Sequence, residues 1–126
     1  MAKIYLASHS KARKKLLESL GLKFKVLPSE IKERRSAKGI SYAKLVKLNA
    51  QEKAEEAAAR IKNGIVIAAD TIMVQDGKIF GKPKSLQDAK FMLKKISRKP
   101  QLVYTGIAVI KKEEGEGRGK GKERRV

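Results

Sequence analysis

A run of five apolar residues, IVIAA at positions 65–69, stands near the middle of the 126-residue chain. Continuous rather than alternating apolar character is typical of a central strand that is covered on both faces of its sheet. Segments with helical periodicity lie on both sides of this run in the sequence. The run therefore predicts a layered α/β domain built around one buried strand.

Three segments place apolar residues three or four positions apart, which is the spacing of an amphipathic helix. We expect these helices over residues 11–20, 41–61 and 85–96. Shorter apolar runs predict further strands over residues 3–7, 24–27, 78–80 and 102–110. The central strand continues extended over residues 71–74, and Asp76-Gly77 then signals a hairpin turn.

The chain carries a formal net charge of +18. Such a charge attracts nucleic acid, anionic membranes or phosphorylated small molecules, although a lysine-rich solvated surface would give the same total. Aromatic residues are not interleaved with the basic residues, which speaks against a surface that stacks single-stranded bases. Cysteine is absent and no segment has the apolar length of a membrane span, so we expect a cytoplasmic protein with no membrane partner.

The chain contains a single histidine, His9, and none of the GxxxxGK[ST], GxGxxG or HExxH motifs. A histidine-based triad or a histidine-rich metal site is therefore not expected. The remaining reactive groups are carboxylates, hydroxyls, lysines and arginines. This set suits metal-assisted phosphoryl chemistry, in which a carboxylate holds Mg²⁺ or activates water while cations neutralise phosphate charge.

The segment SHSKAR at positions 8–13 joins the first expected strand to the first expected helix. A helix N-terminus presents unpaired N–H groups and a partial positive charge, so Ser8, Ser10 and Arg13 are candidate phosphate ligands. Ordinary helix capping by Ser8 or Ser10 would also explain these residues.

Asp70, followed by Thr71, comes directly after the central apolar run. The carboxyl end of a central strand is where α/β sheets place their ligand crevice, and carboxylates are rarely buried without a partner. Asp70 is therefore the main candidate for a catalytic carboxylate, with a turn or capping aspartate as the alternative.

Three further charged residues are candidates for the same site. Lys82 lies in a Gly-Lys-Pro loop that could present it to a phosphate, and Glu33 lies in the polar segment 28–40 and could bind a metal. Lys53 stands at the rim of the apolar face of the 41–61 helix. Solvated or snorkelling side chains would also explain each of them.

Four segments, in order, resemble those of the Maf-like nucleoside triphosphate pyrophosphatases: LASHSKARKKLL, LNAQEKA, IAADTIMVQDGKIFGKPKSLQDAKFML and VYTGIAVI. The resemblance covers residues 3–110 and implies a mixed twisted sheet flanked by helices, the first lobe of a Maf/inosine-triphosphatase-like fold. It implies hydrolysis of a nucleoside triphosphate to monophosphate and pyrophosphate with a divalent metal, Mg²⁺ or Mn²⁺, and it allows a homodimer.

The resemblance also implies roles for individual residues. Asp70 corresponds to the proton acceptor and a metal ligand, and Glu33 lies near the metal or the substrate. The residues that the resemblance assigns to substrate and phosphate binding are Ser8, Ser10, Arg13, Lys53, Thr71 and Lys82. The Asp70-Thr71 pair matches the pyrimidine-selective members, which favours dTTP, UTP or a modified nucleotide, although Ala12 stands where those members carry a second arginine. A non-catalytic module that binds polyanions or nucleic acid is the alternative.

The resemblance ends near residue 110, and members of the family run well beyond this length. We therefore expect residues 1–110 to form the N-terminal part of such a domain, in a truncated or frameshifted product that is a poor enzyme but still binds phosphate. Residues 111–126 consist almost entirely of lysine, arginine, glutamate and glycine, which predicts a disordered tail.

Overall fold

The computed structural model of the chain describes residues 3–80, 85–98, 101–114 and 121–125. Its elements follow in the order β1 (Ile4–Leu6), α1 (Lys11–Ser19), β2 (Lys25–Val26), α2 (Tyr42–Ala58), β3 (Gly64–Gln75), β4 (Lys78–Phe80), α3 (Leu86–Arg98), β5 (Leu102–Glu114) and β6 (Gly121–Arg125). Every helix and strand expected from the sequence is present, and β6 is additional.

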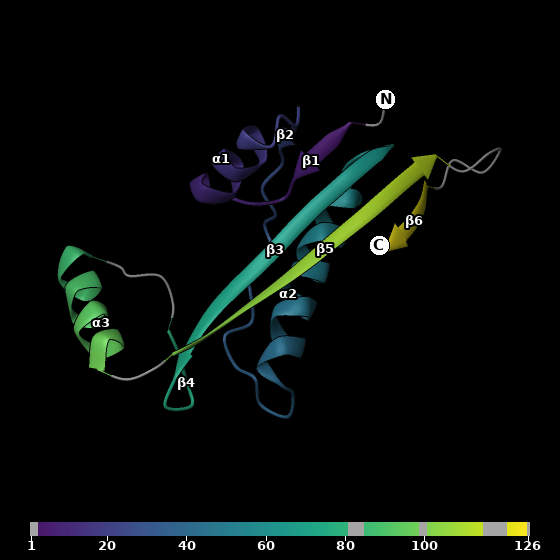
Figure 1. Cartoon of the computed structure of the whole chain (residues 1–126). Helices are drawn as coiled ribbons and strands as arrows, with labels where there is room; N and C mark the ends of the chain where they lie inside the picture. Colours follow the sequence, from purple (N-terminus) through teal and green to yellow (C-terminus); the bar gives the residue numbers. More distant parts are fainter. Residues whose placement is uncertain (1–2, 81–84, 99–100, 115–120, 126) are drawn as a thin grey trace.

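Six strands form one mixed sheet in the order β2-β1-β3-β5-β6, with β4 pairing to β3. β1 runs parallel to β2 and β3, whereas β3 pairs antiparallel with β4 and β5. Figure 1 shows α2 lying along one face of the long β3–β5 pair, with α1 beside β1 and β2. The predicted fold class, a mixed twisted sheet flanked by helices, is confirmed.

α2 forms the main cover of the sheet because its buried face consists of small and aliphatic side chains. The helix begins after Ser41, whose hydroxyl accepts a hydrogen bond from the Lys44 N–H and so caps the first turn. Alanine dominates the buried positions, among them Ala50, Ala54 and Ala57, so the helix axis can approach the sheet closely. Ala54 and Ala57 pack in one cluster with Val66 and Ala68 of β3 and Ile110 of β5, and Leu45 and Val46 of the same helix pack in a second with Ile72 and Val74 of β3.

β3 runs from Gly64 to Gln75, one residue beyond the predicted extended stretch 65–74 at each end, and this length sets the place of Asp70. The residue was expected at the carboxyl end of the central strand, whereas β3 continues unbroken to Gln75 and holds Asp70 near its middle. The cause is the antiparallel pairing with β5, which keeps β3 extended from Gly64 to Val74. The parallel partner β1 nevertheless ends opposite Ile67, so Asp70 still lies just beyond the end of a neighbouring strand.

The apolar faces of α1 and α3 are not covered by the described part of the chain. α1 has no buried residue, and its Leu16 and the C-cap residue Leu20 are exposed. Leu86, Phe91 and Leu93 of α3 are exposed as well, and Figure 1 shows α3 set apart from the sheet. The periodic apolar pattern therefore predicts these helices but not what packs against them.

The expected disordered tail differs from what the structure describes. β5 extends past residue 110 to Glu114, and β6 pairs antiparallel with it between Ile110↔Arg125 and Glu114↔Gly121. The physical reason is that an edge strand such as β5 offers unpaired backbone N–H and C=O groups, which a following segment can satisfy whatever its side chains. None of the helices in the described ranges has the length and apolarity needed to cross a bilayer.

Candidate functional site

A cavity of about 790 Å³ opens along one edge of β3. On that edge, β1 pairs with β3 as far as Ile67, and β4 pairs with β3 again from Met73. The stretch between these two pairings contains Asp70 and Thr71, which line the cavity. The N-terminal end of α1 and the segment before α2 form two further walls, and Lys53, Phe80 and Met92 also line the cavity.

The α1 wall carries the hydroxyls and the arginine that the sequence singled out. Ser10 is the N-cap of α1 and accepts a hydrogen bond from the Arg13 N–H at 3.2 Å, while the Ser8 hydroxyl accepts one from the Ser10 N–H at 3.0 Å. The Arg13 guanidinium crosses to β3 and donates to Thr71 Oγ1 at 3.0 Å, and Thr71 Oγ1 in turn lies 3.0 Å from Thr105 Oγ1 of β5. A helix N-terminus and an arginine thus face the cavity, which is an arrangement suited to binding an anion.

Asp70 is the most buried acidic residue of the cavity, with 2% of its surface exposed. Its Oδ2 accepts a 2.7 Å hydrogen bond from the Asn49 side-chain amide on α2. Its Oδ1 lies 3.6 Å from Nη1 of Arg35. A buried carboxylate needs such partners, and here one oxygen is bound by a neutral donor while the other faces a cation.

Lys53 and Glu33 form an ion pair beside Asp70. Lys53 is 7% exposed, pairs with Glu33 Oε1 and donates to the Ala69 carbonyl oxygen at 3.3 Å. The other oxygen of Glu33, Oε2, accepts from Nη2 of Arg35 at 3.1 Å. Burial raises the pKa of Glu33, but the hydrogen bond and charge of Lys53 and the charge of Arg35 act against it, so the pKa is held below its ordinary value of 4.5. Glu33 is therefore a carboxylate near neutral pH.

Two anchors on α2 fix the segment that carries Glu33. The first is Asn49, whose Oδ1 accepts from the Arg34 N–H at 2.9 Å and whose Nδ2 donates to the Arg34 carbonyl at 3.0 Å. The second is Glu56, whose Oε1 accepts from the Glu30 N–H at 2.8 Å. Burial raises the pKa of Glu56, yet the Glu30 N–H and the Arg60 guanidinium outweigh it and lower that pKa. Glu33 thus lies between two points at which its backbone is tied to one helix.

The structure brings together seven of the eight site residues predicted from the sequence. Asp70, Glu33, Lys53, Ser8, Ser10, Arg13 and Thr71 all line the same cavity. Lys82, predicted to bind phosphate, lies outside the described residues. Proximity does not assign a role, so proton transfer, metal binding and phosphate binding by these residues stay predictions.

Sequence reasoning missed Asn49 and Arg35. Asn49 carried a detectable signal, because it is a polar residue within the apolar stripe of α2, one helical turn before Lys53. Arg35 carried none, since it is one of many basic residues in a segment read as a polar loop. Its place is set by the backbone anchor at Arg34, which no local pattern reveals.

The carboxylates present suit a hard divalent cation such as Mg²⁺ or Mn²⁺. Glu33 and Asp70 lie close enough for one guanidinium to reach both, and both offer oxygen ligands. The described residues contain no group of three or more His, Cys, Asp or Glu arranged to hold a metal ion. Mg²⁺ is commonly held by one or two carboxylates with substrate phosphates completing its shell, and this pair fits that pattern.

Several proteins named dTTP/UTP pyrophosphatase are similar to this chain over most of its length. The dTTP/UTP pyrophosphatase of Caldanaerobacter subterraneus is 50% identical over 110 residues, which are 86% of this chain and 52% of that protein. The proteins of the same name from Ruminiclostridium cellulolyticum and Carboxydothermus hydrogenoformans are 43% and 41% identical, over 87% and 86% of this chain and 57% of each relative. The chain thus spans little more than half the length of these relatives.

A solved nucleoside-triphosphatase (dITP/XTP pyrophosphatase) of Mycobacterium abscessus matches 98% of this chain and 70% of its own, with 15% identity and a TM-score of 0.38. That score is too low to establish a shared site. The family model described as Maf-like protein, in contrast, matches residues 3–126. The chain belongs to the Maf-like protein family.

Proposed function

We propose that the chain acts as a nucleoside triphosphate pyrophosphatase, which splits a (deoxy)nucleoside triphosphate into monophosphate and pyrophosphate. The observation that carries this proposal is a nearly fully buried carboxylate, Asp70, in a cavity whose other charged walls include Arg13, Lys53 and Arg35. Anion-binding groups around one positioned carboxylate are what hydrolysis of a phosphoanhydride requires. The relatives named dTTP/UTP pyrophosphatase support this reaction and favour dTTP or UTP as substrates.

In this mechanism the α1 wall binds the phosphates. Arg13 and the N-terminal end of α1 neutralise phosphate charge, and the Ser8 and Ser10 hydroxyls add hydrogen bonds. Lys82, although outside the described residues, is a further candidate for this role. Binding by these groups orients the α-phosphorus towards Asp70.

Asp70 then acts as the general base. A water oxygen attacks the α-phosphorus, the α–β anhydride bond breaks, and pyrophosphate leaves with the bonding electrons. The proton of the water passes to the Asp70 carboxylate, which the Asn49 amide holds in orientation through Oδ2. A bound Mg²⁺ or Mn²⁺, held by Glu33 and Asp70, would neutralise charge on the phosphates and lower the barrier to attack. Lys53 keeps Glu33 ionised and in place for that task.

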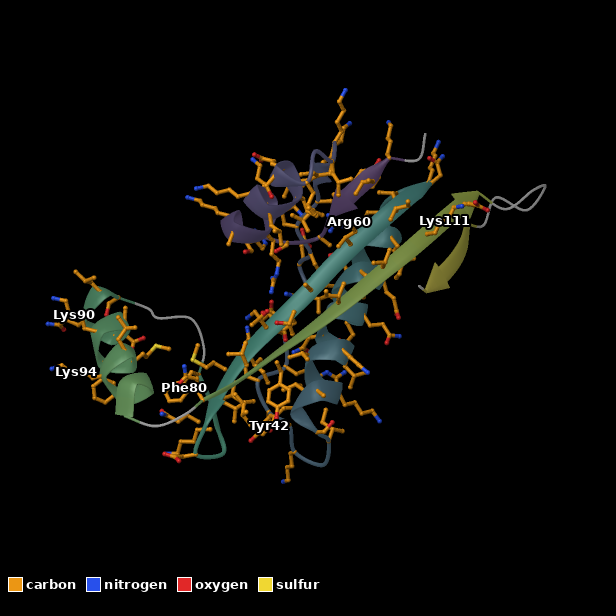
Figure 2. All side chains as sticks on the ribbon, in the orientation of Figure 1. Tyr42, Arg60, Phe80, Lys90, Lys94 and Lys111 are labelled. Atoms are coloured by element: carbon orange, nitrogen blue, oxygen red, sulfur yellow. The ribbon has the colours of Figure 1, made fainter. Side chains whose placement is uncertain are left out.

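A second function, a non-catalytic module that binds polyanions, is favoured by one observation. The chain carries a net charge of +18, and Figure 2 shows Lys90 and Lys94 of α3 pointing away from the sheet. Such a surface attracts nucleic acid without any need for Asp70. Hydrolysis requires Asp70 and polyanion binding does not, so substitution of Asp70 distinguishes the two functions.

The test is a turnover assay with a panel of nucleoside triphosphates, with and without Mg²⁺ or Mn²⁺. We expect metal-dependent release of pyrophosphate, and Asp70→Asn should lower the rate by about 10²- to 10⁴-fold while nucleotide affinity changes little. Asp76→Asn is the matched control, because it makes the same substitution at a hairpin position with φ 53° that asparagine tolerates. Equal turnover of the parent and Asp70→Asn would exclude Asp70 as the base.

A further inference from the structure

We propose that Arg35 is the exchangeable cation of this site. It holds Glu33 and Asp70 together while no divalent cation is bound, and it moves onto the triphosphate when a divalent cation takes its place. This inference rests on the proposed function and assigns a role to a residue that the sequence did not point to.

The Arg35 guanidinium reaches both carboxylates of the site. Nη2 of Arg35 lies 3.1 Å from Glu33 Oε2, and Nη1 lies 3.6 Å from Asp70 Oδ1. One planar cation therefore spans the two carboxylates that fit a divalent metal. A metal ion bound by both carboxylates would require the same oxygen lone pairs, so the two cations compete.

Arg35 and Lys53 both contact Glu33, but they differ in how easily a divalent cation could displace them. Lys53 also contacts Glu33, but its side chain is only 8% exposed and it donates to the Ala69 carbonyl as well. Moving Lys53 would leave a buried ammonium and a buried carbonyl without partners, which is costly. The Arg35 side chain is 41% exposed and can turn into the cavity without such a penalty. Arg35 is thus the cation that can be exchanged.

The four charged side chains around Asp70 sum to zero net charge. Glu33 and Asp70 carry two negative charges, and Lys53 and Arg35 carry two positive ones, so the group is already neutral before any ligand binds. A divalent cation entering this neutral group meets repulsion from Arg35. Once displaced, Arg35 remains at the wall of the cavity, where its fork of N–H donors matches phosphate oxygens. Loss of the guanidinium should therefore strengthen metal binding and weaken triphosphate binding.

Two opposite changes in affinity test this inference. Mn²⁺ binding to the nucleotide-free protein is measured by the loss of the free-ion electron paramagnetic resonance signal. Binding of an α,β-methylene deoxythymidine triphosphate, which the enzyme cannot cleave, is measured by calorimetry at saturating Mg²⁺. For Arg35→Gln we expect Mn²⁺ to bind about two- to fivefold more tightly and the analogue to bind about tenfold or more weakly.

Arg34→Gln is the matched control. It removes one positive charge from the neighbouring position, but Arg34 pairs with Glu52 at 2.8 Å and is not among the cavity-lining residues. Both of its affinities should move much less than those of Arg35→Gln. Arg35→Lys, which keeps the charge but not the fork, should give intermediate values and covers the case in which Arg35→Gln does not fold.

The inference is overturned if Arg35→Gln and Arg34→Gln shift Mn²⁺ binding equally, because the loss of any positive charge near the site would then explain the change. It is also overturned if Arg35→Gln weakens Mn²⁺ binding or leaves binding of the analogue unchanged. None of these measurements uses turnover. Failure of the proposed function would instead appear as absence of metal-dependent hydrolysis in the parent, so the two failures are distinguishable.

Discussion

The side-chain amide of Asn49 donates a 2.7 Å hydrogen bond to Oδ2 of Asp70, across the interface between α2 and β3. The same amide exchanges two hydrogen bonds with the backbone of Arg34. One side chain therefore links the candidate general base, the helix that covers the sheet, and the segment that carries Glu33. Because Asn49 belongs to α2, the position of the Asp70 carboxylate depends on the position of this helix.

The first prediction is that Asn49→Leu weakens both stability and turnover. Leucine fills a similar volume but supplies no hydrogen bond, so Asp70 Oδ2 and the Arg34 backbone lose their partners. An unsatisfied buried group such as Asp70 Oδ2 costs about 1–3 kcal/mol, so the free energy of unfolding should fall by about this amount in denaturant melts. The rate of pyrophosphate release should fall as well, because the carboxylate is no longer held in one orientation.

Gln51→Leu is the control for this substitution. Gln51 is also an amide on α2, but it donates to Glu55 at 2.9 Å and does not line the cavity. We expect it to leave the unfolding midpoint and the turnover close to those of the parent. Equal effects of the two substitutions would mean that the Asn49–Asp70 bond has no special role.

Much of this arrangement was predictable from local patterns. The uninterrupted apolar run before Asp70 predicted the strand β3, although its two faces differ: Val66 and Ala68 are buried, whereas Ile65 and Ile67 are only partly buried. Helix capping by Ser8 or Ser10 was one of two interpretations of the segment before α1, and the structure shows Ser10 as the cap, bound to the Arg13 N–H. Asp76 and Gly77, both with positive φ, form the expected turn between β3 and β4.

The rest depends on contacts between distant segments, which a local pattern does not contain. Arg35 reaches Asp70 only because the backbone at Arg34 is bound to a helix that begins several residues later. The exposure of Leu16 on α1 is likewise set by what surrounds the helix rather than by its periodicity. The sequence did not predict the pairing of β6 with β5. This pairing depends on hydrogen bonds between backbone groups, which many side chains allow, whereas the charged side chains of the segment indicated disorder.

A second prediction concerns Arg13 as a phosphate ligand. Its guanidinium donates to Thr71 Oγ1 at 3.0 Å at the wall of the cavity. Arg13→Ala should weaken binding of a nucleoside triphosphate by about 10- to 100-fold, the range for a hydrogen bond to a charged group, and should barely change binding of the nucleoside. Calorimetric titration with both ligands measures this difference. Lys14→Ala, the next position on α1 and outside the cavity lining, should leave both affinities near those of the parent.

A third prediction is that stability declines in acid partly through Glu33. Its pKa is lowered in the folded state by Lys53 and Arg35, so the unfolded chain binds more protons in the window below the ordinary value of 4.5. The stabilisation is complete above that value and is lost as the pH falls through the lower pKa of the folded state. Glu33→Gln should therefore flatten the fall in unfolding free energy between about pH 5 and pH 3.

Glu56 provides an internal comparison for this pH dependence, because its pKa is lowered as well. Glu56→Gln should remove a separate part of the acid slope, and the double substitution should flatten it further than either single one. A Glu33→Gln protein whose unfolding free energy follows the parent slope throughout this window would contradict the prediction.

The last prediction concerns Gly106 of β5, which lies opposite Asp70 in the sheet register. A Cβ atom at this position would lie 2.4 Å from the carbonyl carbon and oxygen of Val46 and 2.6 Å from the Lys47 nitrogen. These are backbone atoms of α2, so no rotation of a side chain can make room. Gly106→Ala must therefore push α2 away from the sheet, at the cost of about 1–3 kcal/mol that is usual for overpacking.

The displacement should also reach the site, because Asn49 is three positions after Val46 on the same helix. We expect Gly106→Ala to lower the unfolding midpoint and the turnover together. Ile107→Ala, on the exposed face of the same strand with 66% of the residue accessible, should leave turnover near the parent rate. The double substitution Gly106→Ala/Val46→Ala should not restore activity, since the clash involves the backbone of Val46 and not its side chain. Recovery in that double variant would show that side-chain crowding, rather than backbone approach, sets the distance between α2 and Asp70.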